Sequence, residues 1–541
     1  MATWSPTPVD RTRDPTAADW WRGAILYQIY PRSFADSDGD GIGDLPGATA
    51  RLDHVASLGV DGIWLSPFFA SPMRDFGYDI ADYRAVDPVF GTLADFDALI
   101  ARAHALGLRV IIDQVYSHTS DDHAWFRESR ASRDNARADW YVWADAKPDG
   151  SPPSNWQSVF GGPSWTWDAR REQYYLHNFL AAQPDLNVRN PAVQDALIDT
   201  ARFWLDRGVD GFRLDAINFA IHDPALTDNP PVAKPARRTR PFDFQHHLHN
   251  QSQPEIGDFL ARLRGMLDAR GCYFTVAEVG GEQADREMLD YTAGADRLHS
   301  AYGFTFLYAD ALDPTLVASA QAGWPSDPGV GWPSWAFSNH DAPRVASRWA
   351  GDHDTQVVAR FAMTLLMCLR GNAFIYQGEE LGLPQGCVPF ERLQDPEAIA
   401  NWPQTHGRDG ARTPMPWQAV AHQAGFSTAE PWLPLDPAHR ALSVDRQQDD
   451  AGSMLAHTRA MVALRHDRPA LRTGGVAPLD YPSPLLGFQR GTDLDAVLCV
   501  FNTGRHAVDW PLPDGWRVLT VVNGATARML PPFGALLAIR S

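Results

Sequence analysis

Three short segments contain most of the polar side chains that could carry out chemistry together. GFRLDAIN and FSNHD both begin with strand-like apolar residues and present a carboxylate, Asp215 in the first and Asp341 in the second. Between them, CYFTVAEV is another apolar run that presents Glu278 near its end. Three strand ends that each carry an acid indicate one polar site at one rim of a sheet. Paired carboxylates suit the cleavage of a glycosidic bond, with one as nucleophile and one as proton donor.

The neighbours of these acids suggest separate roles for them. Arg213 precedes Asp215 by two residues, so the two side chains share a strand face and Arg213 is expected to keep Asp215 ionised, as a nucleophile requires. A purely structural ion pair is the alternative for this pair. Glu278 lies between Ala277 and Val279, and apolar surroundings would raise its pKa and keep it protonated as a general acid.

Two histidines belong to the same candidate rim. Asp341 follows His340, and an Asp at this position is suited to bind sugar hydroxyls; the alternative is an ordinary N-cap of a helix over APRVA. His118 ends the segment DQVYSH. A lone histidine is more often structural than functional, so only its convergence with the acids favours a role for His118.

Strand-like and helix-like segments alternate along the chain, which predicts a parallel sheet. Further strands are expected in VDGFRLDA, YFTVAEV, PSWAFSNHD and NAFIYQGEE, and an eighth near 301–307. Eight such units predict an α/β fold, a (β/α)₈ TIM barrel, whose active site forms at the carboxyl ends of the strands. The first elements read as strands at 24–30, 60–67 and 108–115, with helices at 48–59 and 96–107.

The spacing of the acids fits a barrel with insertions. The interval from Glu278 to Asp341 is close to two βα units of about 31 residues each, whereas the interval from Asp215 to Glu278 is too long for one unit. The surplus, 219–254, is polar and Pro-rich, and we expect a long loop over the site. The predicted domains are a flexible leader (1–19), the first part of the barrel (20–118), a lobe inserted after strand 3 (119–185), the remainder of the barrel (186–465) with an insertion at about 380–440, and an all-β sandwich domain (466–541).

The composition of the 541-residue chain excludes some classes of partner. Its formal net charge of −19 disfavours nucleic acids and anionic membranes and fits a neutral substrate. We find no run of about 18 apolar residues and no signal-peptide pattern, so neither a membrane span nor secretion is expected. The four cysteines are dispersed without a CxxC pair, which favours a reduced, cytoplasmic protein.

The segment DSDGDGIGD is rich in oxygen ligands. Four carboxylates and one backbone carbonyl could surround a hard cation, Ca²⁺ or Mg²⁺. An Asp/Gly turn without a metal is the alternative, but four acids this close would repel one another without a cation. The candidate ligands are Asp36, Asp38, Asp40, Asp44 and the carbonyl of Ile42.

The ordered set DQVYSH, QPDLN, GFRLDA, AEV and FSNHD resembles the conserved regions of the α-amylase superfamily. The segments YQIYPRSFADSDGDGIGDLPG, RDFGYDIADY, AFIYQGEE and GRDGARTPMPW resemble its branch of α-glucosidases and oligo-1,6-glucosidases, and the resemblance runs from about residue 20 to 440. It implies Asp215 as nucleophile, Glu278 as acid/base and Asp341 as transition-state stabiliser. It also implies a structural metal at DSDGDGIGD. The implied substrate-binding residues are Asp75, Tyr78, His118, Arg213, His340, Arg408 and Arg412. The resemblance does not decide which of Arg408 and Arg412 points into the site.

The sequence departs from the family pattern at two positions. Ser117 stands before His118 where the family usually has Asn, and Ala277 stands before the general acid where it usually has Gly. Neither change removes a catalytic group. The change at Ser117 affects the expected hydrogen bonds near the sugar.

The resemblance implies a glycoside hydrolase, an exo-acting α-glucosidase that hydrolyses or transfers terminal α-glucosyl units, with alcohols or phenols as acceptors. Since the two acids would end neighbouring strands about 4.8 Å apart, we expect retention of configuration. Ala216 after the nucleophile is small, which favours α-1,4 over α-1,6 linkages. The alternatives are an oligo-1,6-glucosidase, a sucrose isomerase or a trehalose-forming enzyme. A non-catalytic accessory subunit is disfavoured because all three acids are present.

Overall fold

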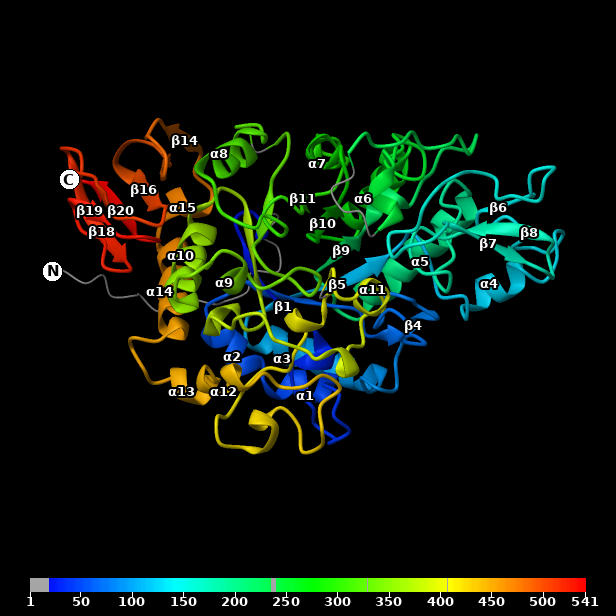
Figure 1. Cartoon of the computed structure of the whole chain (residues 1–541), viewed down its shortest axis with the longest axis horizontal. Helices are drawn as coiled ribbons and strands as arrows, with labels where there is room; N and C mark the ends of the chain where they lie inside the picture. Colours follow the sequence, from blue (N-terminus) through cyan, green and yellow to red (C-terminus); the bar gives the residue numbers. More distant parts are fainter. Residues whose placement is uncertain (1–18, 235–239, 328, 406) are drawn as a thin grey trace.

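Eight parallel strands form the centre of the molecule in this computed structural model, which describes residues 19–541 except 235–239, 328 and 406 (Figure 1). They are hydrogen-bonded in the order β11, β10, β9, β5, β2, β1, β13 and β12. An isolated parallel bridge between Ala301 and Pro333 connects the two ends of this series, so the barrel is nearly closed. The strands are β1 (Ile25–Ile29), β2 (Gly62–Leu65), β5 (Arg109–Val115), β9 (Gly211–Asp215), β10 (Phe274–Val279), β11 (Ser300–Gly303), β12 (Ser334–Ala336) and β13 (Asn372–Tyr376).

Buried, mostly apolar strands make the inner layer of this barrel. All seven residues of β5 and all five of β9 are buried, as expected for strands covered on both faces. The strand predicted near 301–307 is present as β11, which confirms the count of eight. The helices that cover the outside are α1 (Leu45–Ala50), α2 (Leu52–Ser57), α3 (Leu93–Ala105), α5 (Pro191–Asp206), α6 (Ile256–Asp268), α7 (Ala284–Thr292), α8 (Pro314–Ala322), α10 (Thr355–Cys368) and α14 (Met454–Asp467).

Local sequence signals define the ends of these helices. A capping box between Thr92 and Asp95 begins α3, and α5 begins with Pro191 after the N-cap Asn190. The prediction of a single helix at 48–59 is wrong, because α1 and α2 are separate short helices. Arg51 interrupts them, since its backbone leaves the helical region with φ −104° and ψ 2°.

Two long segments, each inserted after a barrel strand, surround the rim of the barrel. Residues between β5 and α5 form a lobe with α4 (Ala124–Ser129) and a three-stranded antiparallel sheet of β6 (Trp143–Ala144), β8 (Gln173–Leu176) and β7 (Trp165–Asp168). This lobe projects to one side of the barrel in Figure 1. The second segment is the long connection from β9 to α6, whose described residues include two short helical turns, at Ile217–Phe219 and Pro241–Phe244.

The C-terminal part of the chain is an antiparallel β domain. It contains a five-stranded sheet and a separate two-stranded ribbon, β17 (Val508–Asp509) with β19 (Met529–Leu530). Among the described residues, no helix is both long enough and apolar enough to cross a bilayer. The five-stranded sheet has the order β14 (Val476–Leu479), β15 (Leu485–Arg490), β16 (Val497–Asn502), β20 (Ala535–Arg540) and β18 (Trp516–Val522).

Candidate active site

The three candidate catalytic acids line a single cavity at the carboxyl ends of the strands. Asp215 is the last residue of β9, and Glu278 lies near the end of the adjacent β10, one position after the paired residues Leu214 and Ala277. Asp341 lies in the loop that follows β12. The cavity has a volume of about 590 Å³, a size that suits a small ligand.

Arg213 lies beneath two of these acids. Its side chain is fully buried, and its Nη1 is 2.5 Å from a carboxylate oxygen of Asp215 and 2.5 Å from one of Asp113 in β5. Its Nη2 forms an ion pair with Glu278 and donates to the hydroxyl of Tyr302 at 3.0 Å. One guanidinium is therefore shared by three carboxyl groups. We call Arg213, Asp113, Asp215 and Glu278 the Arg213 cluster.

Burial shifts the pKa values of this cluster upward. It raises the pKa of Asp215 to about 7, with Arg213 opposing the shift and Asp113 adding to it. It also raises the pKa of Glu278 to about 7, again against the effect of Arg213. Arg213 favours the ionised form of Asp215, as expected, but burial outweighs its effect because its charge is divided among three acids. Since ionisation of one carboxyl disfavours ionisation of its neighbour, Asp215 and Glu278 titrate as a coupled pair, which suits one proton between them near neutral pH.

Two further hydrogen bonds orient the carboxyl group of Glu278. The hydroxyl of Tyr302 donates to its Oε1 at 2.9 Å, and the backbone N–H of Ala216 donates to its Oε2 at 3.2 Å. Ala216 has a φ of 38°, in the left-handed region that a residue with a side chain rarely adopts. This turn follows Asp215 directly, so both acids depend on the same backbone geometry.

Asp341 has a different electrostatic environment. Its carboxylate lies 2.7 Å from Nη2 of Arg412, 3.5 Å from Nη1 of Arg408 and 3.2 Å from Nε2 of His340. Burial alone would raise the pKa of this carboxyl, but His340 and the two arginines hold it well below its usual range. Asp341 does not cap a helix, because α9 (Val345–Arg348) begins after Arg344. We call Asp341, His340, Arg408 and Arg412 the Asp341 cluster.

The two arginines of this cluster occupy different depths. Arg408 lines the cavity and also pairs with Asp75 at 2.9 Å and with Asp395 at 2.8 Å. Arg412 is fully buried behind Asp341 and donates from Nε to the carbonyl of His340 at 2.7 Å. Arg408 is therefore the arginine that enters the site.

His340 is a neutral hydrogen-bonding group in this structure. Burial lowers its pKa to about 3. The side-chain amide of Gln28 lies 2.8 Å from Nδ1 of His340, so Nδ1 accepts and Nε2 carries the proton that faces Asp341 and the hydroxyl of Tyr78. The rings of Tyr78 and His340 are stacked, with centroids 5.3 Å apart. His340 itself lies behind the cavity wall.

Polar groups from other loops line a further part of the cavity. Asp75, Tyr78 and His118 line it, and Gln183 bridges Asp75 at 3.1 Å and His118 at 3.2 Å. Burial lowers the pKa of His118 to about 3, so its ring is neutral. The hydroxyl of Ser117, the position that departs from the family pattern, lies 2.9 Å from Nδ1 of His118. Ser117 therefore supplies a hydrogen bond to the ring from within the same loop.

Four residues that complete these networks were not predicted from the sequence. Asp113 had a visible signal, because an acid inside the apolar strand LRVIIDQV must have a buried partner. Gln183 is the first residue of QPDLN, one of the segments that carry the family resemblance. Tyr302 and Asp395 had no comparable signal, since each is polar in a loop or short strand and is recognisable only by its contacts. All four hold a predicted site residue through a hydrogen bond or an ion pair.

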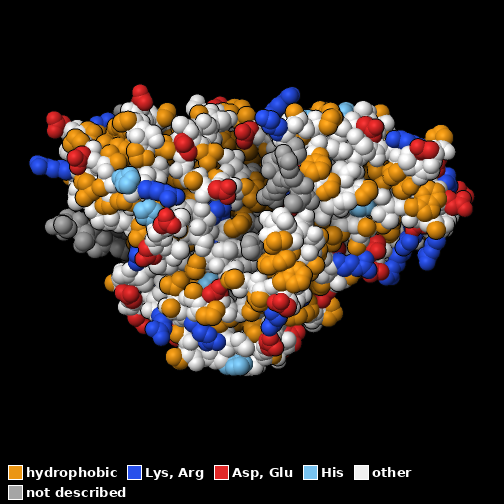
Figure 2. Space-filling view, in the orientation of Figure 1, with side chains coloured by type: hydrophobic (Ala, Val, Ile, Leu, Met, Phe, Trp, Pro, Cys, Tyr) orange, Lys and Arg blue, Asp and Glu red, His pale blue; other side chains and the backbone are white. Residues whose placement is uncertain are grey.

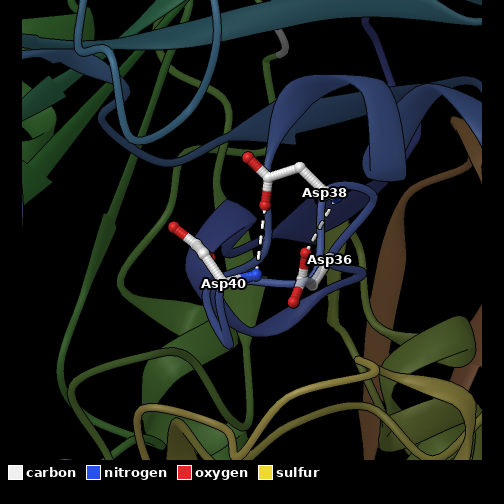
Figure 3. A group of neighbouring side chains, drawn as sticks. All are labelled: Asp36, Asp38 and Asp40. Atoms are coloured by element: carbon white, nitrogen blue, oxygen red, sulfur yellow. Dashed lines mark hydrogen bonds between the residues drawn. The ribbon is translucent and has the colours of Figure 1, made fainter.

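The candidate metal loop lies apart from the cavity-lining residues. Asp36, Asp38 and Asp40 each offer a carboxylate oxygen within 4.8 Å of the others, from one tight turn (Figure 3). Three backbone N–H groups and the hydroxyl of Ser427 also donate to Asp36. Asp44 has a different role, because one of its oxygens caps α1 at Gly47 and the other accepts from Ser37. Three of the four predicted acids thus form a set that suits a hard cation.

Comparison with protein families agrees with the architecture. The model of the α-amylase catalytic domain matches residues 28–474. The chain belongs to the α-amylase family. It is 53% identical over 505 residues to a probable α-glucosidase of Rhizobium meliloti (strain 1021), covering 92% of this chain and 91% of that protein. It is 35% identical over 563 residues to an oligo-1,6-glucosidase of Heyndrickxia coagulans, and the match covers 96% of this chain and 99% of that protein.

Solved structures of α-amylase family enzymes superpose on nearly the whole chain. An α-glucosyl transfer enzyme, XgtA, has a TM-score of 0.92 at 50% identity and covers 96% of this chain and 99% of that one. A mutant of isomaltulose synthase from Erwinia rhapontici NX5, solved with its natural substrate sucrose, has a TM-score of 0.86 at 31% identity, covering 96% and 98%. Enzymes of this family therefore share both the barrel and the C-terminal sheet with this chain, which is a glycoside hydrolase.

Proposed function

We propose that this chain is a retaining, exo-acting α-glucosidase that removes terminal α-1,4-linked glucose from maltose-like oligosaccharides or other small α-glucosides. The observation that carries the proposal is the shared cavity of Asp215 and Glu278 at the ends of adjacent strands. Adjacent strands lie about 4.8 Å apart, which suits the 5–5.5 Å carboxyl separation of retaining enzymes better than the wider separation of inverting ones. The similarity to a probable α-glucosidase supports the same substrate class.

The reaction follows from one shared proton. The ionised Asp215 attacks the anomeric carbon while the protonated Glu278 donates its proton to the glycosidic oxygen, so the aglycone leaves as an alcohol. Glu278 then removes a proton from water, which attacks the glucosyl ester and releases glucose and free Asp215. Asp341, ionised and held by arginines, is placed to bind ring hydroxyls as the bond breaks.

Exo action is supported by an ion pair in the lining of the cavity. Asp75 and Arg408 join two loops there, and we infer that this pair blocks a continuing sugar chain. A terminal glucose bounded by this pair and by Tyr78 and His118 has room for an aglycone only towards the mouth.

Linkage preference is assigned from Ala216, which lines the cavity next to Asp215. A small side chain there leaves room beside the scissile bond, which favours α-1,4. An oligo-1,6-glucosidase, a sucrose isomerase or a trehalose-forming enzyme remains the alternative. Incubation with maltose, isomaltose, sucrose and trehalose, followed by product analysis, tests the proposal: maltose should be cleaved fastest to glucose. Faster cleavage of isomaltose, or a rearranged disaccharide as the main product, would replace it with an alternative.

We also propose that the enzyme transfers glucose to alcohol or phenol acceptors. Phe160, Phe179, Phe219 and Phe304 line the cavity, so an acceptor ring would meet aromatic surface and less water. The similarity to an α-glucosyl transfer enzyme supports this. Maltose with a high concentration of hydroquinone should yield a glucosylated phenol; its complete absence would exclude transfer but not hydrolysis.

A structural cation at Asp36, Asp38 and Asp40, either Ca²⁺ or Mg²⁺, is proposed as well, with the Ile42 carbonyl as a further ligand. Their convergent carboxylates support it. Such an ion would offset the repulsion between these carboxylates and stabilise the loop. Chelation should lower the melting temperature and leave the kinetics of the folded enzyme unchanged. An unchanged melting temperature, with no anomalous signal at this loop in a crystal grown with Ca²⁺, would contradict the proposal.

We assign the enzyme to the cytoplasm from its thiols. Cys368, Cys387 and Cys499 are free cysteines, of which Cys387 is exposed, and a reduced compartment preserves such groups. Cell fractionation with an antibody against the chain tests the location: recovery with secreted proteins would overturn it.

A further inference from the structure

Tyr302 in β11 lies directly opposite Glu278 of β10 in the register of the two parallel strands. Paired residues on neighbouring strands point to the same face, so both side chains reach the interior of the barrel. The phenol ring is 1% exposed and lies near the rings of Trp64 and Phe374, with centroids 6.3 and 5.7 Å away. Tyr302 is not among the described residues that line the cavity, so its hydroxyl can act on the reaction only through its neighbours.

The contacts of Tyr302 fix the direction of its O–H group. Nε and Nη2 of Arg213 lie 3.1 and 3.0 Å from the phenol oxygen, and a guanidinium can only donate hydrogen bonds. The phenol oxygen therefore accepts from Arg213. Its own hydrogen is left for Oε1 of Glu278, which lies 2.9 Å away.

The two carboxyl oxygens of Glu278 consequently have unequal surroundings. Oε1 faces the guanidinium of Arg213 in an ion pair and accepts from the hydroxyl of Tyr302, and both contacts disfavour a proton on this oxygen. Oε2 accepts one longer hydrogen bond, at 3.2 Å, from the backbone N–H of Ala216, a residue that lines the cavity. Because a carboxyl oxygen has two lone pairs, Oε2 keeps one for a proton.

We propose that Tyr302 is a positioning residue, which holds Oε1 of Glu278 so that Oε2 carries the proton that is transferred in the reaction. This inference rests on the proposed function. The proton leaves Oε2 for the glycosidic oxygen, which also keeps the electron pair of the broken bond, and a proton from water returns to Oε2 in the second step. Since a hydroxyl donates more strongly to a carboxylate than to a neutral acid, Tyr302 also stabilises the base form that the second step requires.

The proton affinity of Glu278 depends on groups from three barrel strands and two loops. Burial raises its pKa, Arg213 and the hydrogen bond from Tyr302 lower it, and the nearby acids raise it. Charged side chains on the surface are scattered and face water, as Figure 2 shows, whereas most of the groups around Glu278 are buried and therefore act on it strongly. These groups are Asp113, Arg213, Asp215, Tyr302, Tyr308 and Asp341.

Tyr302→Phe removes the hydroxyl and keeps the ring, so it tests this donor alone. Loss of a donor to the ionised form should raise the pKa of Glu278 and move the alkaline limb of kcat/KM on maltose about one pH unit higher. At neutral pH kcat should fall about tenfold through the less well oriented acid, with KM unchanged. An alkaline limb at the wild-type position, in a variant with a native melting curve, would overturn the inference.

The matched control is Tyr175→Phe. Tyr175 is also buried, and its hydroxyl donates to the carbonyl of Ala181 in the inserted lobe at 2.9 Å. Its loss should leave the alkaline limb and kcat unchanged. Tyr302→Leu replaces Tyr302→Phe in the same measurements if the melting curve of the latter is not native.

A double variant separates an effect through Glu278 from a general structural effect. If Tyr302 acts through Glu278, adding Tyr302→Phe to Glu278→Gln should cause little further loss on an activated nitrophenyl glucoside. Losses that multiply would show that Tyr302 acts elsewhere and would overturn the inference.

Carbon-13 NMR of carboxyl-labelled glutamate follows Glu278 without turnover. The signal that is missing from Glu278→Gln identifies this carboxyl group. A higher pKa in Tyr302→Phe than in the wild type would support the inference, and an equal or lower one would overturn it. If the wild type cleaves no α-glucoside, the proposed function fails, and this titration still decides whether Tyr302 controls the proton on Glu278.

Discussion

The Arg213 cluster and the Asp341 cluster share one cavity but shift their acids in opposite directions. In the first, a single guanidinium contacts three carboxyls, and the pKa values of Asp215 and Glu278 rise to about 7. In the second, Arg412 and Arg408 both reach Asp341, whose pKa falls well below its usual range. Asp215 and Glu278 are buried, whereas the side chain of Asp341 is 23% exposed. The greater number of cations per carboxyl and the greater exposure both favour the ionised form of Asp341.

This difference separates two roles that one cavity must combine. A pair of acids with raised pKa values can exchange a proton with the substrate and with water. An acid that never takes up a proton can bind hydroxyls or stabilise positive charge at the anomeric carbon, but it cannot act as a general acid. The proposed mechanism therefore gives proton transfer to the Arg213 cluster and charge stabilisation to the Asp341 cluster.

The strongest test of the comparison is Asp215→Asn. Loss of the nucleophile should reduce kcat about 10⁴-fold or more. The fold should persist, because the variant relieves repulsion within the Arg213 cluster: an acid whose pKa is raised by folding destabilises the protein as pH rises through that value. Kinetics on maltose and a melting curve at pH 8 check both parts. Near-normal activity with native circular dichroism would show that Asp215 is not the nucleophile.

Glu278→Gln removes the second carboxyl group of the coupled pair, the proposed acid/base. Activity on maltose should fall about 10²–10⁴-fold, the range typical of general acid–base catalysis. An activated nitrophenyl glucoside should lose less in the glycosylation step, since its leaving group needs little protonation. Single-turnover rates on both substrates measure this difference. Equal losses on the two would argue that Glu278 acts on structure rather than on the leaving group.

The pH profile reports the two clusters directly. Activity should be lost as pH falls through the raised pKa of Asp215, which must be ionised, and as pH rises through the raised pKa of Glu278, which must be protonated. A bell of kcat/KM centred near neutrality is therefore expected, with no limb from Asp341. On an activated substrate, Glu278→Gln should lack the alkaline limb. An optimum near pH 4–5, the range of ordinary carboxyls, would contradict the upward shifts.

A smaller effect is expected from a substitution that replaces no side chain of either cluster. Ala216→Val adds two methyl groups beside the scissile bond at a residue with φ 38°, a conformation that β-branched residues adopt at a cost. The kcat/KM for maltose should fall about tenfold relative to isomaltose, as one or two methyl groups can achieve. Matching losses on the two disaccharides would mean that Ala216 does not set linkage preference, and Ala216→Gly serves as the control for volume.

Much of the barrel could be predicted because strand and helix signals alternate regularly. Runs such as LRVIIDQV are buried on both faces, and Gly or Pro marks the helix ends. The failure at 48–59 has a local cause: Asp44 and Pro46 begin a helix earlier than the apolar pattern indicates, and Arg51 breaks it. The pattern of apolar residues within one short segment does not reveal a helix break that depends on packing against other segments.

The sequence could predict which acids lie at the rim, but not how their pKa values are shifted. Asp215, Glu278 and Asp341 follow apolar runs, so their place at a rim could be inferred from the chain. The sharing of Arg213 with Asp113 depends on the register between β5 and β9, in which these two residues are paired. No spacing in the sequence states that register, and it is what turns a simple ion pair into a proton-sharing cluster.

The central claim is that Asp215 forms a covalent glucosyl intermediate while Glu278 supplies and removes the proton. Proton NMR during the first minutes of maltose hydrolysis tests it most directly, because double displacement preserves the configuration at the anomeric carbon. The mechanism predicts that α-glucose appears first and that β-glucose follows only by mutarotation. Initial release of β-glucose would require direct attack by water and would contradict the mechanism.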